Sequence, residues 1–226
     1  MPNDKGKTTE AMGGYMKAIA SQTKKSRRPL SVFGMTLLFI LIAFGGWCFE
    51  KVGRYFLYGS LGDRGFLSLP LCPIYGTCVL GIGLLFGTPQ IPSPLLTRLC
   101  SWVGRLPSFW EKVGRWGIYF LAATGTATAT ELVVGLTFRQ IGIPLWDYSA
   151  RAGNFMGVIC PSFSLLWGFL LTLLMGTVWD RLCLLIEKIP KERQKSLAVC
   201  LVVLIGGDFL FNCLFVLFRG ERFLIL

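Results

Sequence analysis

Hydrophobic and polar positions alternate along this chain in long blocks, not in the short periods of amphipathic segments. Runs of about 20 residues are nearly free of charge, which is long enough to cross a hydrocarbon core about 30 Å thick. The expected fold class is therefore an all-α, polytopic transmembrane helix bundle of about five spans. The blocks predict these spans near residues 30–58, 72–88, 113–138, 160–186 and 196–218.

The polar blocks divide the chain further. Residues 1–29 are polar and basic, so we expect a disordered cytoplasmic arm ahead of a transmembrane domain over residues 30–226. Residues 59–71 are expected to form an outer loop, and residues 88–113 a proline-rich loop holding a short amphipathic segment near 95–103. Residues 122–130 contain only Ala, Thr and Gly, a composition that favours close helix packing.

Composition agrees with this class. The chain is 53% hydrophobic and only 15% charged, whereas soluble domains carry about 25% charged residues. A net charge of +11 would suggest nucleic acid in a soluble protein. In a membrane protein the Lys and Arg residues determine topology and contact anionic lipid. We therefore expect the lipid bilayer as a partner, no nucleic acid, and a multi-pass location in a cell membrane.

The distribution of Lys and Arg predicts the orientation. With the N-terminus inside, 16 of the 23 Lys and Arg residues fall on inner segments and 7 on outer segments. Each inner segment carries more of them than any outer segment. Because cytoplasmic loops carry the excess of positive residues, the pattern predicts an N-in, C-out arrangement.

The sequence lacks the residues that usually support metal binding, nucleotide binding and nucleophilic catalysis. The chain has no histidine, and none of its eight cysteines forms a Cys-x-x-Cys pair, so neither a metal site nor a cofactor is expected. It has no phosphate-binding Gly-x-x-x-x-Gly-Lys-Ser/Thr loop and no evident nucleophile beside a base, so no catalytic residue is assigned. Cys72 and Cys160, both predicted on the outer side, could form a disulfide.

A short pattern occurs twice. The first span ends near Glu50, and the second begins with Cys72-Pro73 after an outer loop. The third span ends near Glu131, and the fourth begins with Cys160-Pro161 after another outer loop. Transporters are often built from duplicated helix pairs. Since few positions match, both a duplicated pair and chance similarity remain open.

The acidic residues are the strongest candidates for function. Glu50 and Glu131 lie near the outer ends of their spans, where they could be solvated or could face an interior cavity. Arg64 and Arg151 are their expected partners. Asp208 lies in the middle of the fifth span with Asn212 one turn later. These two could form structural hydrogen bonds to another helix or a proton or substrate relay.

Polar and aromatic residues around the outer loops complete a hypothetical substrate-binding set. Trp146-Asp147-Tyr148 places an acid between two rings, as in a clamp. Trp167 is interpreted as an aromatic-belt anchor. The predicted set is Glu50, Arg64, Tyr75, Glu131, Trp146, Asp147, Tyr148 and Asn154.

An ordered series of motifs lies between about residues 36 and 175. The motifs are Gly46-Trp47 with Glu50, Arg64-Gly65-Phe66-Leu67, Cys72-Pro73-Ile74-Tyr75-Gly76, Glu131-Leu132 with Gly135, Trp146-Asp147-Tyr148-Ser149, Asn154, Gly157, Ile159-Cys160, Ser164 and Trp167-Gly168. This series resembles the bacterial family of ABC-transporter type IV permeases. The chain departs from the family pattern at Val158, where members usually carry Arg, and at Leu69, where they usually carry Gly.

The resemblance implies a permease subunit with an outward-facing polar site, energised by an ATPase on another chain. The candidate docking surfaces for such an ATPase are the loops 88–113 and 186–195. Two other classes stay open: a non-transporting partner or regulatory subunit of a larger membrane complex, and an intramembrane acid–base enzyme that uses Glu50, Glu131 and Asp147.

The charge pattern makes a testable prediction. A phosphatase fused to the C-terminus should be active, and a fluorescent protein fused there should be dark, because the C-terminus is expected outside. The same reporters fused after residue 190, in an inner segment, provide the opposite control. A C-terminal reporter active only in the cytoplasm would contradict the five-span arrangement.

Overall fold

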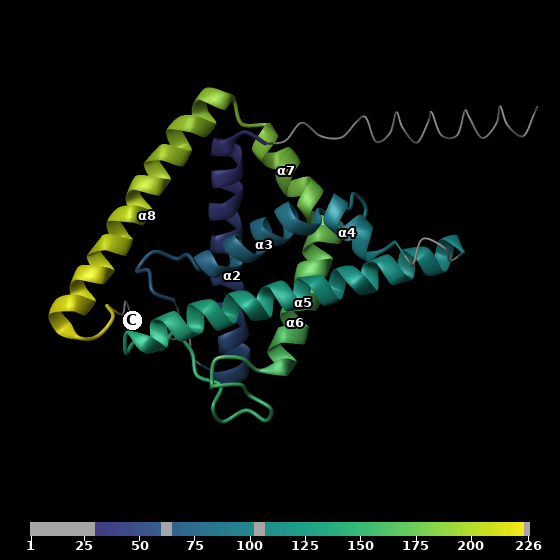
Figure 1. Cartoon of the computed structure of the whole chain (residues 1–226). Coiled ribbons are helices and arrows are strands. Elements are labelled where there is room, and N and C mark those ends of the chain that lie inside the picture. Colours follow the sequence, from purple (N-terminus) through teal and green to yellow (C-terminus); the bar gives the residue numbers. More distant parts are fainter. Residues whose placement is uncertain (1–29, 60–64, 102–106, 224–226) are drawn as a thin grey trace, which may run out of the picture. The chain divides into compact units, whose positions relative to one another are not determined.

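The computed structural model describes residues 30–59, 65–101 and 107–223. The chain divides into two units, residues 1–31 and 32–226, and the architecture below is that of the second unit. The predicted N-terminal arm and Arg64 lie outside the described residues. All regular elements within the described ranges are helices (Figure 1). They are α2 (Val32–Tyr58), α3 (Pro73–Phe86), α4 (Pro94–Leu99), α5 (Ser108–Gln140), α6 (Pro161–Leu173), the π-helical η2 (Leu174–Val178), α7 (Trp179–Glu187) and α8 (Lys191–Arg219).

Four of these helical stretches are long and apolar enough to cross a membrane. They are α2, α5, the continuous stretch from α6 through η2 to α7, and α8, and the hydropathy blocks predicted all four. The helical membrane fold is therefore confirmed. The remaining predicted span, α3, has only 14 residues. At 1.5 Å per residue it is about 21 Å long, shorter than the hydrocarbon core.

The helices pack mainly in neighbouring pairs. The most extensive contacts join α5 to α6 and α2 to α3, while α3 also packs on α5, and α8 on α2. The small residues predicted to favour close packing lie in α5, where Thr124 directly faces Gly168 of α6. The hydroxyl groups of Thr124, Thr126 and Thr128 each donate to the carbonyl four residues earlier at 2.8 Å, which satisfies them within apolar surroundings.

The two helix pairs have similar junctions. Cys72 precedes α3 and Cys160 precedes α6, both with extended backbone and with Pro as the first helical residue. Proline suits this position because its missing N–H would have no helical acceptor. The pairs differ in length, since α3 stops after 14 residues whereas α6 continues through η2 into α7. Neither Cys72 nor Cys160 is part of a disulfide, so the disulfide suggested from the sequence is not formed.

The segment Phe66–Cys72, expected in an outer loop, instead folds back into the interior. The backbone N–H of Cys72 donates to the carbonyl of Ala43 at 3.0 Å, and Ala43 lies in the middle part of α2. Ala43, Leu67 and Leu71 form one buried cluster. This re-entrant segment explains why α3 is short: the helix starts deep in the protein and not at the end of α2.

Asp208 and Asn212 of α8 hold the re-entrant segment. The Asp208 carboxylate accepts the backbone N–H groups of Ser68 and Leu69 at 3.0 and 3.3 Å. The Asn212 amide donates to the Ser68 hydroxyl at 2.9 Å, and Asn212 is completely buried. Non-helical backbone at membrane depth requires such partners, because hydrocarbon supplies none. Of the two interpretations of these residues, the structural hydrogen bonds are observed.

Residues 88–113 were expected to form a loop with a short amphipathic segment near 95–103. Within this range α4 covers Pro94–Leu99 and α5 begins at Ser108, while Thr88 and Pro89 are buried. The buried hydroxyl of Tyr119 donates to the Gly87 carbonyl at 2.9 Å. The side-chain amide of Gln90 reaches the carbonyl of Gly176 within η2. The turn after α3 is therefore built into the helix bundle.

Removing the carboxylate at position 208 should weaken the fold. Asp208→Ala leaves the N–H groups of Ser68 and Leu69 without their acceptor, at a cost of about 1–3 kcal/mol. Asp208→Asn keeps one acceptor oxygen and should lose less. The free energy of unfolding can be measured in mixed micelles with SDS as denaturant. The exposed Glu221→Ala is the control, with an expected change within about 0.5 kcal/mol. An Ala variant as stable as the parent chain would contradict this role of Asp208.

Candidate functional site

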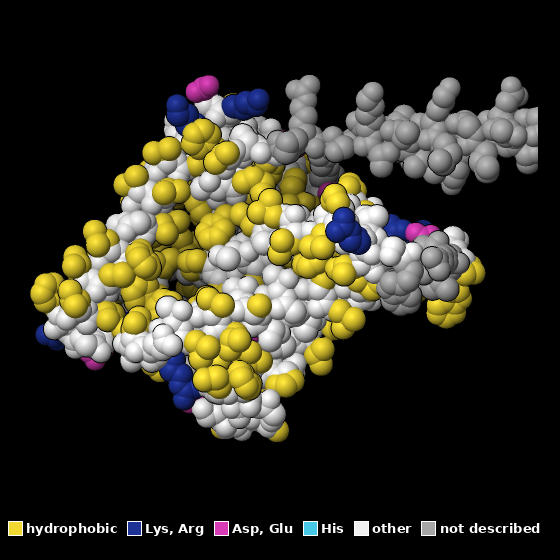
Figure 2. Space-filling view, viewed as in Figure 1, with side chains coloured by type: hydrophobic (Ala, Val, Ile, Leu, Met, Phe, Trp, Pro, Cys, Tyr) yellow, Lys and Arg dark blue, Asp and Glu magenta, His cyan; other side chains and the backbone are white. Residues whose placement is uncertain are grey.

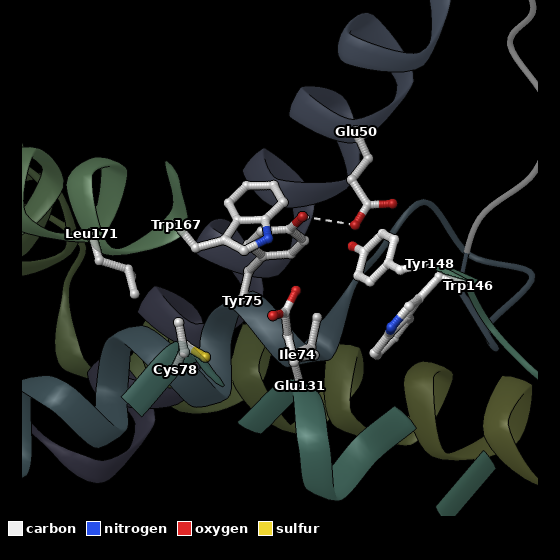
Figure 3. A pocket seen from close by; sticks show the side chains of 10 residues that line it. Glu50, Ile74, Tyr75, Cys78, Glu131, Trp146, Tyr148, Trp167 and Leu171 are labelled. Atoms are coloured by element: carbon white, nitrogen blue, oxygen red, sulfur yellow. Dashed lines mark hydrogen bonds between the residues drawn. The ribbon is translucent and has the colours of Figure 1, made fainter. Parts of the chain in front are cut away.

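Side chains from four helices and one loop converge on a small cavity, which we call the acid chamber (Figure 3). Its volume is about 60 Å³, enough for a few water molecules or one small charged group. The carboxyl groups of Glu50 from α2 and Glu131 from α5 point into it from opposite walls (Figure 3). The chamber is lined by Glu50, Ile74, Tyr75, Cys78, Ala127, Glu131, Trp146, Tyr148, Trp167 and Leu171.

Glu50 is positioned by a close contact between α2 and α3. The Tyr75 hydroxyl donates to the Glu50 carboxylate at 2.7 Å. Gly46 lies one helical turn before Glu50, and a Cβ atom at Gly46 would overlap the Tyr75 ring. The glycine therefore lets the tyrosine ring lie directly on α2, and the next turn supplies the acceptor for its hydroxyl.

Glu131 lies on α5 and is more enclosed than Glu50. Glu131 is only 7% exposed, and its Oε2 atom has no hydrogen-bond partner. The Trp167 indole N–H is directed towards its carboxyl group (Figure 3). One turn later, Gly135 makes room for Trp146 and Val158. Because burying a carboxylate in an apolar interior is costly, Glu131 is a group that a positive charge or a donor would stabilise.

Aromatic rings form much of the remaining wall. Tyr75 and Trp167 meet edge to face, with ring centroids 5.4 Å apart. Tyr148 stacks on Phe163 at 5.1 Å. The Trp146 indole N–H donates to the Val158 carbonyl at 2.9 Å, which fixes this ring to the loop before α6. Aromatic faces carry partial negative charge and attract cations, so the rings and the two carboxyl groups favour the same kind of ligand.

The loop between α5 and α6 is shaped by residues that we predicted as ligands. The Asn154 amide donates to the Ser149 and Arg151 carbonyls at 3.1 and 2.8 Å and accepts from the Gly157 N–H at 3.0 Å. Asp147 is exposed and accepts both the hydroxyl and the backbone N–H of Ser149. These hydrogen bonds hold the pKa of Asp147 below its ordinary value. Asp147 is therefore ionised at neutral pH, outside the acid chamber.

A second cavity, the vestibule, lies beside the acid chamber on the side of this loop. Its volume is about 210 Å³ and it carries both signs of charge. The Arg151 guanidinium lies over the Phe163 ring, 5.8 Å from its centroid. The vestibule is lined by Phe49, Glu50, Gly53, Arg54, Trp146, Asp147, Tyr148, Arg151, Phe163, Leu166 and Trp167.

The structure therefore brings together five members of the predicted set: Glu50, Tyr75, Glu131, Trp146 and Tyr148. Asp147 lines only the vestibule of these two cavities, and Asn154 lines neither. Sequence reasoning missed Cys78, and it assigned Trp167 to the membrane interface although its ring lies over the chamber. The Gly–Glu pairs one turn apart, Gly46 with Glu50 and Glu131 with Gly135, are the sequence signal that could have pointed to these walls.

The departure at Val158 can now be located. Val158 is buried and packs where a Cβ of Gly135 would be, one turn along α5 from Glu131. An apolar side chain thus stands at this position, where the resembled family usually has arginine. Arg151, an expected partner of the two acids, lines the vestibule with Glu50 and is not among the residues that line the chamber around Glu131.

No group of three or more His, Cys, Asp or Glu side chains is placed to hold a metal ion within the ranges that the structure describes. The chemistry that the chamber offers is hydrogen-bond acceptance and attraction of positive charge by two carboxyl groups and several ring faces. Either carboxyl group could also accept a proton.

Comparison with known proteins gives one family. The family model described as "Putative ABC-transporter type IV" matches residues 37–213, which is most of the chain. No curated protein and no solved structure matches.

The charge preference of the chamber can be measured at Cys78, which lines it. At each cysteine the measured quantity is the rate of reaction with cationic aminoethyl methanethiosulfonate divided by the rate with the anionic sulfonatoethyl reagent. We expect this ratio to be about ten times higher at Cys78 than at Cys200, since about 1.4 kcal/mol of attraction is a factor of ten. Cys200 is exposed on α8 and serves as the internal reference. Mass spectrometry resolves the two sites.

Glu131→Gln should lower the preference for the cationic reagent at Cys78, since it removes one of the two carboxyl groups of the chamber and leaves only Glu50. Equal rates for the two reagents at Cys78 in the parent chain would contradict an anionic chamber.

Proposed function

We propose that this chain, which belongs to the ABC-transporter type IV family, is the membrane-embedded permease subunit of a transporter. In this proposal the acid chamber binds a polar group of the substrate, and a separate ATPase subunit supplies the energy. We place the protein in a bacterial plasma membrane. The family assignment supports a transporter component, and the chamber supports a binding role within it.

The observation that carries the proposal is the convergence of Glu50 and Glu131 from two separate helix pairs. A carboxyl group with an unpartnered oxygen is destabilising in an apolar interior and is usually found where it faces a cavity or a transported species. Here Glu131 Oε2 has no partner while four aromatic rings surround the same space. Stability alone gives no reason to keep such a group.

The cavities around the chamber supply routes to it. Glu50 and Trp146 line the acid chamber, the vestibule and a third, apolar cavity. A substrate that reaches these two residues from the vestibule would pass Asp147 and Arg151. By the distribution of Lys and Arg, this side of the protein is the outer one. The arrangement therefore favours entry from, or release to, the outer side.

The ATPase would need a cytoplasmic docking surface. Of the two predicted loops, residues 88–93 form a turn that is tied to Tyr119 and η2 through Gly87 and Gln90. The turn between α7 and α8 is more suitable, because Lys188, Lys191 and Arg193 are all exposed there. We favour this basic turn as the docking surface.

The alternatives have less support. A non-transporting partner could use the small-residue face of α5 to contact another subunit, but Thr124 on that helix faces Gly168 of α6 within the same chain. An acid–base enzyme would use Glu50, Glu131 and Asp147 together, and Asp147 does not line the chamber. Neither alternative accounts for the shared lining of the three cavities as directly as a permease does.

Isolation of the tagged chain from its native membranes tests the permease assignment. We expect a nucleotide-binding subunit in fixed ratio to this chain and ATP hydrolysis by the purified complex in nanodiscs. Glu131→Gln should lower that hydrolysis by about tenfold or more, since loss of about 1.4 kcal/mol of transition-state stabilisation is a factor of ten. Insertion and subunit ratio should stay unchanged.

The exposed Glu221→Gln is the matched control and should hydrolyse ATP at the parent rate. A chain recovered without any ATPase subunit would overturn the permease assignment. Full hydrolysis in the Glu131→Gln complex would return Glu131 to a structural role.

A further inference from the structure

A cavity lined by α2, α3, α5, α8 and the segments between them is called here the apolar cavity. In the space-filling view a hollow opens beside α8, and the side chains visible around it are hydrophobic (Figure 2). Phe39 of α2, Phe138 of α5 and Phe209 of α8 stand on three of its walls. Its volume of about 500 Å³ lies within the range of about 300–1,000 Å³ that is typical of small-molecule sites.

This cavity exists because α8 packs on α2 and leaves the rest of its surface open. Only 6% of the most apolar window of α8 is buried. Near the cavity, α8 is joined to the re-entrant segment through Asp208 and Asn212. The helix therefore forms a side wall whose outer face carries exposed apolar residues such as Val203 and Leu210. A cavity behind such a wall is within reach of molecules dissolved in the lipid.

The apolar cavity and the acid chamber share part of their lining. Glu50, Ile74 and Trp146 line both. One end of the combined space thus offers two carboxyl groups and ring faces, and the other end offers almost only hydrocarbon surface. The complement of that space is an amphiphile with a small positive headgroup and one apolar chain.

Charge and size restrict the headgroup. An anionic headgroup such as a carboxylate would be repelled by Glu50 and Glu131, whereas an ammonium group would gain an acceptor at the unpartnered Oε2 of Glu131 and contacts with ring faces. The chamber of about 60 Å³ holds a primary ammonium group but not a bulky one. A neutral headgroup would gain hydrogen bonds but not charge attraction.

We propose that the substrate is a long-chain amine, with its ammonium group in the acid chamber and its chain in the apolar cavity. This inference rests on the proposed function and names its substrate class. The ammonium group lies between Glu50 and Glu131, and the chain extends past Ile74 towards Ile205 and Phe209 of α8.

Two adjacent glycines of α8 allow a matched test. Gly206 lines the apolar cavity and Gly207 does not. A Cβ atom at either glycine would meet nothing within 4 Å, so the first atom of a new side chain is tolerated at both. Gly206→Leu should fill part of the cavity, while Gly207→Leu makes the same chemical change on the same helix outside it.

The measurement is protection of Cys78 from N-ethylmaleimide by butylamine and by tetradecylamine, with Cys200 as the unprotected reference, in nanodiscs of one lipid composition. Gly206→Leu should raise the half-protecting concentration of tetradecylamine at least about tenfold, the loss of roughly two buried methylene groups. Butylamine should be unaffected by Gly206→Leu. Gly207→Leu should match the parent chain for both amines.

Glu131→Gln should weaken protection by both amines, and tetradecanol and tetradecanoate should protect poorly. Equal protection by tetradecanol would overturn the cationic headgroup. If protection by both amines depends on Glu131 but is unchanged in Gly206→Leu, the placement of the chain in the apolar cavity is wrong. The polar site of the proposed function would then be unaffected. Absence of protection by either amine would overturn the headgroup site itself, and with it the substrate class.

Discussion

The structure depends on one constraint: backbone N–H groups that lie outside helices must be satisfied inside the protein when no water is present. The re-entrant segment Phe66–Cys72 meets it through the carboxylate of Asp208, which accepts from Ser68 and Leu69. These contacts fix where α3 begins. The start of α3 in turn places Tyr75 against Gly46 and Glu50. An acid in the last helix thus determines the geometry of a site in which it takes no part.

The two acids of the chamber differ in their hydrogen-bond partners and in how far they are enclosed. Glu50 has a donor in Tyr75 and lines all three cavities, so it can exchange partners with whatever occupies them. Glu131 is enclosed, and one of its oxygens has no partner. The free oxygen of Glu131 can therefore accept a hydrogen bond from a donor that enters the chamber.

Hydropathy alone predicted the four long spans, because nearly every residue of a helix that crosses lipid must be apolar. It did not predict the re-entrant segment. Phe66, Leu67 and Leu71 have no regular spacing, and their polar support comes from Asp208, about 140 positions away. Such a long-range hydrogen bond has no local signal in the chain.

The sequence pointed to the acidic residues of the candidate site more clearly than to its aromatic and amide residues. Glu50 and Glu131 were recognised because a carboxylate in an apolar run requires an explanation. The role of Trp167 stays open in the sequence, because an interfacial ring and a cavity wall require the same amphipathic side chain. Asn154 is a related case, since an amide that binds substrate and one that holds a loop look identical in a sequence. Only the hydrogen bonds distinguish them.

The separation between Ser68 and Asp208 also has a consequence for how the protein is made. At a synthesis rate of about 5–20 residues per second, the 140 residues between them take about 7–28 s to appear. During that interval the backbone N–H groups of Ser68 and Leu69 lack their final acceptor, so the segment cannot settle among lipid chains. The first helix pair must wait, still hydrated or held by the insertion machinery, until the last helix has left the ribosome. A chain truncated before Asp208 would reach the membrane with these two N–H groups lacking the acceptor that the full chain provides.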